Sequence, residues 1–416
     1  MDKKAEIISI GNELLNGNTV NTNASYMARR LHENGMPVTW IQTVRDEAGA
    51  IQAALDIALK RSQVILVTGG LGPTHDDITK QVLADYFRSQ LVFHEEIFEK
   101  IKKRFEKRGL QMPELNRGMA LVPHNAEIIP NNLGTAPGLI FKRDSQLIFV
   151  MPGVPRELEA MIELTVIPRL RQECPECRVQ TDIFRTTGIT ESAFYEKIAQ
   201  ELSFFPQYEI AFLPKVTGVD LRVVRQSEEV QNHEIFEKFK NVLYNAVGEF
   251  IYTTQELELE AILGNMLRGK KLTIAVAESL TGGLIQDKLT AVPGSSEYFL
   301  GGVVAYSNAS KVKLLGVLQQ SLDEHGAVSE QVAREMAAGV REKFTSHIGL
   351  STTGIAGPTG TTIAKPVGLV YIGVAYQSTM LVRKYQFGVD RLMNKQRAAQ
   401  AGLELVRRMI AGLPYE

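Results

Sequence analysis

The chain has 416 residues, of which 44% are hydrophobic and 22% are charged, and its formal net charge is −1. This length exceeds what one ordinary hydrophobic core accommodates, so we expect two or three globular domains. The near-neutral charge argues against a large surface for nucleic acid or membrane and favours small-molecule chemistry. With neither a signal-peptide core nor an apolar run approaching ~18 residues, we expect a soluble cytoplasmic protein.

Strand-like and helix-like segments alternate over residues 1–170. Short, continuous apolar runs indicate buried strands, and apolar positions at helical spacing indicate helices. This alternation predicts a doubly wound α/β domain with a mostly parallel sheet, which binds ligands at the carboxyl ends of its strands. The expected strands are 6–10, 37–44, 64–68 and 146–151, and the expected helices are 23–33, 50–61, 78–87 and 155–170.

Residues 171–254 predict a small α+β, KH-like linker module. Its glycines, Gly188, Gly218 and Gly248, never form the Gly-x-x-Gly loop by which KH domains clamp an RNA backbone, so we expect a spacer or a dimerising element. The two cysteines, Cys174 and Cys177, lie in a polar connector without the further ligands that zinc requires. The expected elements are helices 191–202 and 230–247 and strands 208–213 and 219–224.

Residues 255–416 predict a second α/β domain. Ser329 is a plausible N-cap for a helix over 330–344, and a long helix closes the chain. The other expected elements are a helix over 257–267, a helix after Thr281, strands 272–277, 299–306, 348–353 and 369–376, and the closing helix 391–410.

A glycine-rich turn joins the strand 64–68 to the helix that follows it. Gly69, Gly70 and Gly72 allow a phosphate to approach the backbone closely. Asp76 and Asp77 stand at the helix start, where they could hold a divalent cation against the charge of a pyrophosphate. The endings typical of a P-loop and of a dinucleotide-binding loop are missing. The alternative is that both aspartates only cap the helix and complement its dipole.

A second polar run, 11–23, also follows a strand and precedes a helix. Two such turns at strand carboxyl ends converge on one cleft in this architecture. Together with the runs 132–138 and 151–157, they resemble the molybdopterin-binding-like domain of the CinA (competence/damage-inducible protein) family, and the resemblance extends over the whole chain.

The resemblance implies metal-dependent hydrolysis of ADP-ribose to AMP and ribose 5-phosphate. Related domains of molybdenum-cofactor biosynthesis bind molybdopterin, so a molybdopterin-binding module without hydrolase activity is the alternative. The divalent metal would be held by Asp76 and Asp77. The implied substrate-binding residues are Glu13, Asn23, Gly69, Gly70, Gly72, Thr74, Gly134 and Gly153.

The run 277–283 places Ser279 at a strand-to-helix turn, where free backbone N–H groups can cradle an oxyanion or a phosphate. A serine hydroxyl attacks poorly unless a base removes its proton. The candidate bases are Lys311, His325 and His347, of which His347 borders a strand and has the character of an element-end residue. A buried lysine can be neutral and act as a base.

A third glycine-rich run, 352–360, could hold a substrate phosphate or ribose, with Thr353 adding a hydroxyl donor. Arg391 could pair with a phosphate or carboxylate through a bidentate fork. Singly, each residue has a structural explanation: Ser279 as an N-cap, Lys311 and Arg391 as surface charges, and Tyr306 as a strand-end aromatic.

The whole C-terminal region resembles the nicotinamide mononucleotide deamidase (PncC) family, although Leu280 stands where that family often has Cys. The resemblance implies that Ser279 attacks the nicotinamide carboxamide and that Lys311 is the general base, without a metal or other cofactor. Ammonia would leave first and nicotinic acid mononucleotide second. The implied catalytic residues are Ser279, Lys311, Tyr306, Thr353 and Arg391, and the implied substrate-binding residues are Thr281, Gly282, Gly283, Gly354 and Gly357.

The oxyanion hole is expected among the backbone N–H groups near 281–283. The sequence thus predicts a homodimeric hydrolase with two nucleotide substrates, nicotinamide mononucleotide and ADP-ribose, and with neither nucleic acid nor membrane as a partner. An interaction factor in DNA uptake or repair is the other alternative, and the lack of basic clustering argues against direct DNA binding.

Overall fold

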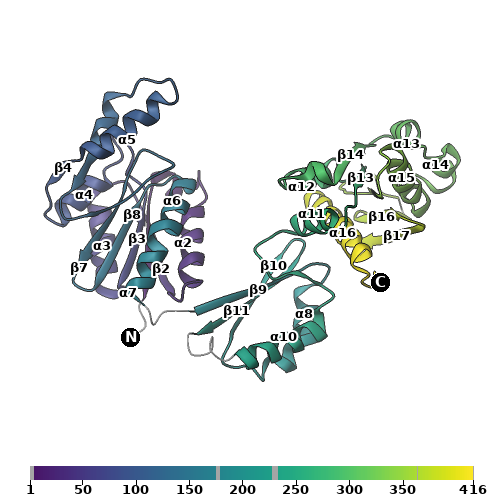
Figure 1. Ribbon diagram of the computed structural model, residues 1–416, viewed down its shortest axis with the longest axis horizontal. Helices are drawn as coiled ribbons and strands as arrows, with labels where there is room; N and C mark the ends of the chain where they lie inside the picture. The colour runs from purple at the N-terminus through teal and green to yellow at the C-terminus, as the bar shows by residue number, and fades with distance from the viewer. Residues whose placement is uncertain (1–3, 175–178, 227–232, 363, 416) are drawn as a thin grey trace. The chain divides into compact units, whose positions relative to one another are not determined.

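The computed structural model describes residues 4–174, 179–226, 233–362 and 364–415. The chain divides into two compact units, Met1–Thr181 with Val224–Asn232, and Asp182–Val223 with His233–Glu416 (Figure 1). Each unit is described by itself.

The first unit is built on a six-stranded sheet of order β2-β1-β3-β8-β7-β6. Strands β2, β1, β3 and β8 are parallel to one another, and β7 and β6 run antiparallel at one edge. The doubly wound, mostly parallel sheet expected from the sequence is therefore confirmed. The strands are β1 (Ala5–Ile10), β2 (Val38–Val44), β3 (Val64–Thr68), β6 (Glu127–Ile129), β7 (Gly138–Arg143) and β8 (Gln146–Met151).

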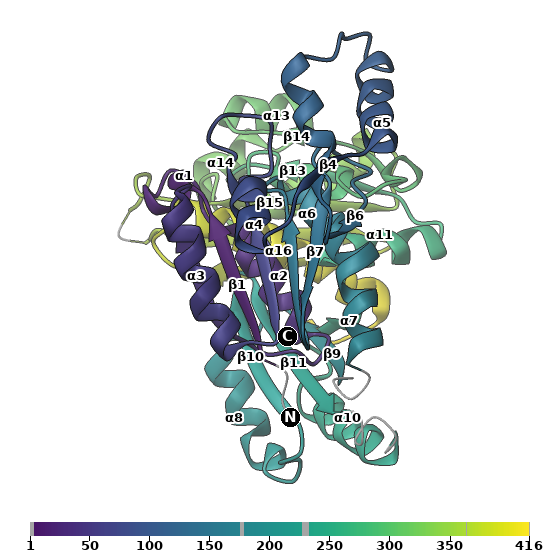
Figure 2. The same cartoon turned by 90° about the vertical axis from the view of Figure 1, so that its left-hand side faces the viewer.

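Helices cover both faces of this sheet because successive side chains of a strand point to opposite faces. On one face Ile7 and Leu66 pack with Met27 and Leu158 of α2 and α6. On the other face the neighbouring strand residues pack against α3 and α4, and Figure 2 shows α3 running beside β1. The helices are α1 (Asn12–Leu15), α2 (Thr22–His32), α3 (Ala48–Arg61), α4 (Thr79–Tyr86), α6 (Pro155–Met161) and α7 (Ile167–Glu173), with a π-helical segment Ile162–Val166 before α7.

The sequence predicted no helices or strands between α4 and β8. Three of its strands have only three residues, too few to show a clear alternation. The turn between β7 and β8 carried a usable sequence signal, because aspartate is common in turns. Asp144 adopts a φ of +51° there. The elements are β4 (Leu91–Phe93), α5 (Glu95–Glu106), the 3-10 segment Glu114–Ala120, β5 (Leu121–Pro123), β6 and β7.

The middle module has a four-stranded sheet of order β10-β11-β9-β12, packed on two helices through an aromatic core that includes Phe184, Phe194 and Phe239. Both helices and the neighbouring strands β10 and β11 were expected, whereas β9 and β12 were not. Part of the expected helix start and Cys177 lie outside the described residues, and Cys174 is buried and free. The elements are β9 (Val179–Thr186), α8 (Glu191–Leu202), β10 (Glu209–Lys215), β11 (Gly218–Gln226), α10 (His233–Val247) and β12 (Ile251–Thr253).

The C-terminal domain is a five-stranded sheet of order β14-β13-β15-β16-β17 between two helix layers. Strand β13 is parallel to β14 and β15, and β16 and β17 are antiparallel. Helices α11, α12 and α16 pack on one face, and α13, α14 and α15 on the other. The strands are β13 (Ile274–Glu278), β14 (Phe299–Val304), β15 (Ile348–Gly354), β16 (Leu369–Tyr376) and β17 (Thr379–Gln386).

The expected cap is present, because Ser329 Oγ accepts the N–H of Val332 at the start of α15. The helices are α11 (Leu259–Gly269), α12 (Leu284–Thr290), the 3-10 turn Ser295–Glu297, α13 (Asn308–Leu315), α14 (Gln319–His325), α15 (Glu330–Lys343) and α16 (Arg391–Ala411).

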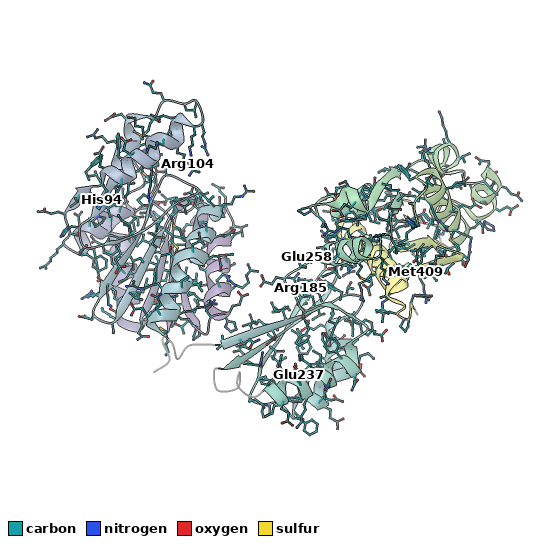
Figure 3. The ribbon with its side chains drawn as sticks, in the orientation of Figure 1. His94, Arg104, Arg185, Glu237, Glu258 and Met409 are labelled. Carbon is teal, nitrogen blue, oxygen red and sulfur yellow. The ribbon has the colours of Figure 1, made fainter. Side chains whose placement is uncertain are left out.

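The middle module contacts the C-terminal domain through polar pairs. Arg185 of β9 bonds to Glu258 at the start of α11, and Figure 3 shows the two side chains next to each other. Gln400 of α16 donates to Thr187 Oγ1 over 3.3 Å. A cavity of about 620 Å³ lies beside these contacts, and none of the site residues expected from the sequence lines it. Among the helices of the described ranges, none is both long and apolar enough to cross a membrane.

Candidate active sites

The serine turn follows β13 and is anchored by a buried carboxylate. The Glu278 carboxylate is fully buried and accepts the backbone N–H groups of Gly283, Ile285 and Gln286 over 2.9, 3.2 and 3.0 Å. It thereby caps the start of α12, and the positive end of the helix dipole stabilises the negative charge of the carboxylate. The Gly283 N–H, expected in the oxyanion hole, is therefore already engaged. This capping role of Glu278 was not expected from the sequence.

The rest of the turn is tied to β15. Ser279 donates its N–H to the carbonyl of Thr352 over 3.0 Å, and the hydroxyls of Thr281 and Thr352 lie 2.7 Å apart, both fully buried. Leu280 packs into the core beneath the turn. Within the described ranges, the N–H groups of residues 280–282 have no hydrogen-bond partner. Hydrogen bonds within the described part of the protein thus do not use these three donors.

Lys311 reaches Ser279 from the helix that follows β14. A capping box between Ser307 and Ser310 starts α13 and places Lys311 on its first turns, with its side chain directed into the protein. Lys311 is 1% exposed, and its Nζ lies 3.0 Å from Ser279 Oγ, 2.8 Å from the carbonyl oxygen of Ala305 and 3.5 Å from that of Tyr306. Ser279 and Lys311 therefore form a direct pair.

Burial of the ammonium lowers the pKa of Lys311 to about 8. Among the residues that the structure describes, no charged partner offsets this burial. A neutral amine has two N–H donors and one lone pair, which match two carbonyl oxygens and one serine hydroxyl. The geometry thus suits a lysine that accepts the hydroxyl proton of Ser279.

The two histidines considered as bases are committed elsewhere. His347 Nδ1 lies 3.0 Å from the backbone nitrogen of Thr273, at the N-terminal end of the sheet. His325 ends α14 and its side chain is half exposed beside Glu324. Neither has a recorded contact with Ser279 in the described part of the chain, so Lys311 is the base that the geometry offers.

Arg391 joins the other two polar runs of the C-terminal domain. Its Nη1 donates to the carbonyl of Gly357 over 2.7 Å, and its Nη2 donates to the Tyr306 hydroxyl over 3.1 Å. Tyr306 is 63% exposed, so its ring is accessible to a ligand. Thr353 is buried, and its hydroxyl donates to the Ala327 carbonyl over 2.6 Å.

The carboxyl ends of three adjacent parallel strands explain this convergence. Ser279 follows β13, Tyr306 follows β14, and Gly354 ends β15. Ends of neighbouring parallel strands meet at one edge of a sheet, where ligands bind in α/β domains. A Cβ on Gly354 would lie 2.6 Å from the Leu369 carbonyl oxygen, so close packing by itself requires glycine there.

The first unit holds a separate cavity of about 560 Å³ at the carboxyl ends of β1 and β3. Thr74 and Gly134 are not among its lining residues. Two further carboxylates, Asp46 in a loop and Glu157 in the first turn of α6, also line it and were not assigned to the site from the sequence. Of the expected residues, those that line the cavity are Glu13, Asn23, Gly69, Gly70, Gly72, Asp76, Asp77 and Gly153.

Packing explains part of the glycine pattern in this cavity. A Cβ on Gly69 would lie 2.1 Å from the Ile10 carbonyl oxygen, and one on Gly70 would lie 2.1 Å from Thr79 Oγ1. Both glycines also have positive φ angles, +109° and +65°. Asn23 donates to the Gly153 carbonyl over 2.7 Å and joins two walls of the cavity.

The aspartates at the start of α4 have local partners. Asp77 accepts the N–H of Thr74 over 2.9 Å, and the hydrogen bond from Thr74 holds the pKa of Asp76 below its usual value. In the described ranges no three His, Cys, Asp or Glu side chains are grouped closely enough to hold a metal by themselves. A magnesium-like ion is commonly held by one or two carboxylates together with substrate phosphates and water, and these residues fit that mode.

Comparisons with known proteins cover the same regions. The family model described as "CinA C-terminal domain" matches residues 256–410, and the one described as "Probable molybdopterin binding domain" matches residues 6–172. A CinA-like protein of Chloroherpeton thalassium is 43% identical over 98% of this chain and 99% of its own length. The chain belongs to the CinA family. Its resemblance to that family, inferred from the sequence, is confirmed.

Two further relatives carry the CinA name. A CinA-like protein of Salinibacter ruber is 41% identical over 98% of this chain and 100% of its own length. A solved structure of CinA from Thermoplasma acidophilum, described there as of unknown function, is 36% identical and covers 39% of this chain and 96% of that chain, with a TM-score of 0.37.

Proposed function

We propose that the C-terminal domain hydrolyses the carboxamide of nicotinamide mononucleotide to nicotinic acid mononucleotide and ammonia. The observation that carries this proposal is the 3.0 Å contact between Ser279 Oγ and the buried Lys311 Nζ. A serine with an adjacent base is the arrangement that activates a hydroxyl for acyl transfer. The family resemblance supplies the substrate.

In the first step Lys311 takes the proton of Ser279 as Oγ attacks the carboxamide carbon. The N–H groups of residues 280 and 281 are the donors that we assign to the developing oxyanion. Lys311 then returns the proton to the departing nitrogen, and ammonia leaves. Water, deprotonated by Lys311, hydrolyses the ester on Ser279 and releases the acid. This course uses no metal or other cofactor.

Tyr306 and Arg391 bind the substrate in this proposal. The pyridinium ring of the substrate is cationic, and an exposed tyrosine ring attracts a cation through its face. Arg391 holds the Tyr306 hydroxyl and the Gly357 carbonyl, so it fixes this wall of the site. Thr353 orients the loop that contains Ala327, and Gly357 allows the backbone to approach the ligand.

The test is incubation of the purified chain with nicotinamide mononucleotide in the presence of a chelator. We expect ammonia and nicotinic acid mononucleotide in equal amounts. Absence of both products, with a folded protein, would refute the assignment.

We propose a second activity, metal-dependent hydrolysis of ADP-ribose to AMP and ribose 5-phosphate, for the cavity of the first unit. The observation that favours it is a cavity of about 560 Å³ with five carboxylates, Glu13, Asp46, Asp76, Asp77 and Glu157, among its lining residues. Asp76 and Asp77 would hold a divalent ion, which neutralises pyrophosphate charge and activates water. Glycine turns allow the phosphates to approach the backbone.

A molybdopterin-binding module without hydrolase activity is the competing proposal for this cavity. Calorimetry with ADP-ribose and with molybdopterin, alongside an AMP assay with and without added divalent metal, separates the two. AMP formation supports the hydrolase, whereas binding of molybdopterin without AMP formation supports the module. We further propose a cytoplasmic homodimer that binds small nucleotides and neither nucleic acid nor membrane. Gel filtration tests the dimer, and a salt-dependent gel shift tests nucleic-acid binding.

A further inference from the structure

An uncommitted lysine lies beside the serine turn. Lys395 belongs to α16, and its Nζ would be 3.5 Å from a Cβ built on Gly282. In the described part of the chain, this ammonium has neither an ion pair nor a hydrogen bond. Gly282 is exposed and has a φ of +63°. The cation therefore faces the accessible side of the turn, whereas Lys311 is buried.

The position of Lys395 in its helix is locally unfavourable. Arg391 begins α16 and Lys395 stands one turn later, so two cations share a face near the positive end of the helix dipole. Residues three and four positions away from Lys395 on either side are Leu392, Arg391, Ala398 and Ala399, and none is acidic. Local helix chemistry thus gives no reason for a lysine here, and an anionic ligand would supply one.

A backbone donor belongs to the same surface. Among residues 280–282 only Gly282 is exposed, its N–H has no partner among the described residues, and glycine at 282 leaves no side chain between the backbone and Lys395. A backbone N–H beside a cation suits a phosphate. Arg391 lies on the same helix face and keeps further N–H donors on its guanidinium.

We propose that Lys395, Gly282 and Arg391 form an anion subsite that binds the 5′-phosphate of the substrate and selects nucleotides over nucleosides. This inference rests on the deamidase activity proposed above. The nucleoside form of the substrate has only its pyridinium cation, which two cationic side chains repel, whereas the nucleotide adds a phosphate that they attract. Specificity then arises from both attraction and repulsion.

The experiment compares kcat/KM for nicotinamide mononucleotide and for nicotinamide riboside in the full chain. Lys395→Ala should lower kcat/KM for the nucleotide by about 10- to 100-fold, chiefly through KM, and should leave that for the riboside unchanged or raised. Lys395→Arg should keep most of the nucleotide activity. Lys384→Ala, an exposed change on β17, is the matched control and should alter neither value.

An equal fall for both substrates, or no fall for the nucleotide, would overturn the subsite. Binding separates this failure from failure of the deamidase proposal. If the wild-type chain releases no ammonia, calorimetry of nicotinamide mononucleotide with Ser279→Ala and with Ser279→Ala/Lys395→Ala still decides the point. Weaker binding in the double variant supports the subsite, and equal binding excludes it.

Discussion

The two polar sites of this chain differ in how complete they are. At the C-terminal site, the reacting side chains are in contact, since Lys311 Nζ lies 3.0 Å from Ser279 Oγ and a buried Glu278 fixes the turn between them. At the N-terminal cavity, glycine turns and carboxylates line a space, but the carboxylates do not gather into a metal cage within the described residues. The first site is preorganised by protein alone, and the second requires a metal and a substrate to complete it.

The largest expected effect separates the two sites. Ser279→Ala should reduce ammonia release from nicotinamide mononucleotide by more than about 10⁴-fold, because the nucleophile is gone. Formation of AMP from ADP-ribose should not change, since the cavity lies in the other unit. Both assays can be run on one protein preparation. Joint loss of the two activities, in a protein that remains folded, would contradict the two-site account.

Lys311→Met should lower the same ammonia release by about 10²- to 10⁴-fold, the range that general bases contribute. The substitution keeps the length of the side chain and removes the amine. Lys313→Met, an exposed change on the same helix, should have no effect and is the control. Activity of Lys311→Met at the control level would exclude lysine as the base.

Metal removal should act on the first unit alone. A chelator is expected to abolish AMP formation, and Asp77→Asn to reduce it by about 10- to 100-fold, because one oxygen ligand and one charge are lost. Release of ammonia should be the same with and without chelator. A chelator-sensitive deamidase would show that the C-terminal site is less complete than its geometry indicates.

The pH dependence of the deamidase gives a smaller effect with a defined sign. The pKa of Lys311 is lowered to about 8, and the neutral form is the base, so kcat/KM should rise about tenfold per pH unit below pH 7 and level off above pH 9. The rise should disappear in Lys311→Met. A fall in kcat/KM over this range would mean that the charged lysine is the active form.

Sequence patterns predicted where strands turn into helices. They did not predict which acceptors bind the backbone N–H groups of those turns. The strands β1, β3 and β13 were expected because each is a short, mostly apolar run that leads into a turn with glycine, and the structure places them inside their sheets rather than at the edges. By contrast, the engagement of the Gly283 N–H by Glu278 depends on how the turn folds back on its own strand. No residue spacing encodes that bend.

Contacts from distant segments were the other part that the sequence could not supply. Asp46 reaches the N-terminal cavity from a loop and Glu157 from the start of α6, and Lys395 reaches Gly282 from the last helix. The residues alone made Lys311 one of three candidate bases for Ser279, and the family resemblance selected it. Their 3.0 Å contact needs both the parallel pairing of β13 with β14 and the capping box of α13.

The most direct test of the account is the release of ammonia from nicotinamide mononucleotide by the intact wild-type chain, measured with chelator present. The account predicts steady production of ammonia, matched mole for mole by nicotinic acid mononucleotide. A folded protein that leaves nicotinamide mononucleotide intact would contradict it.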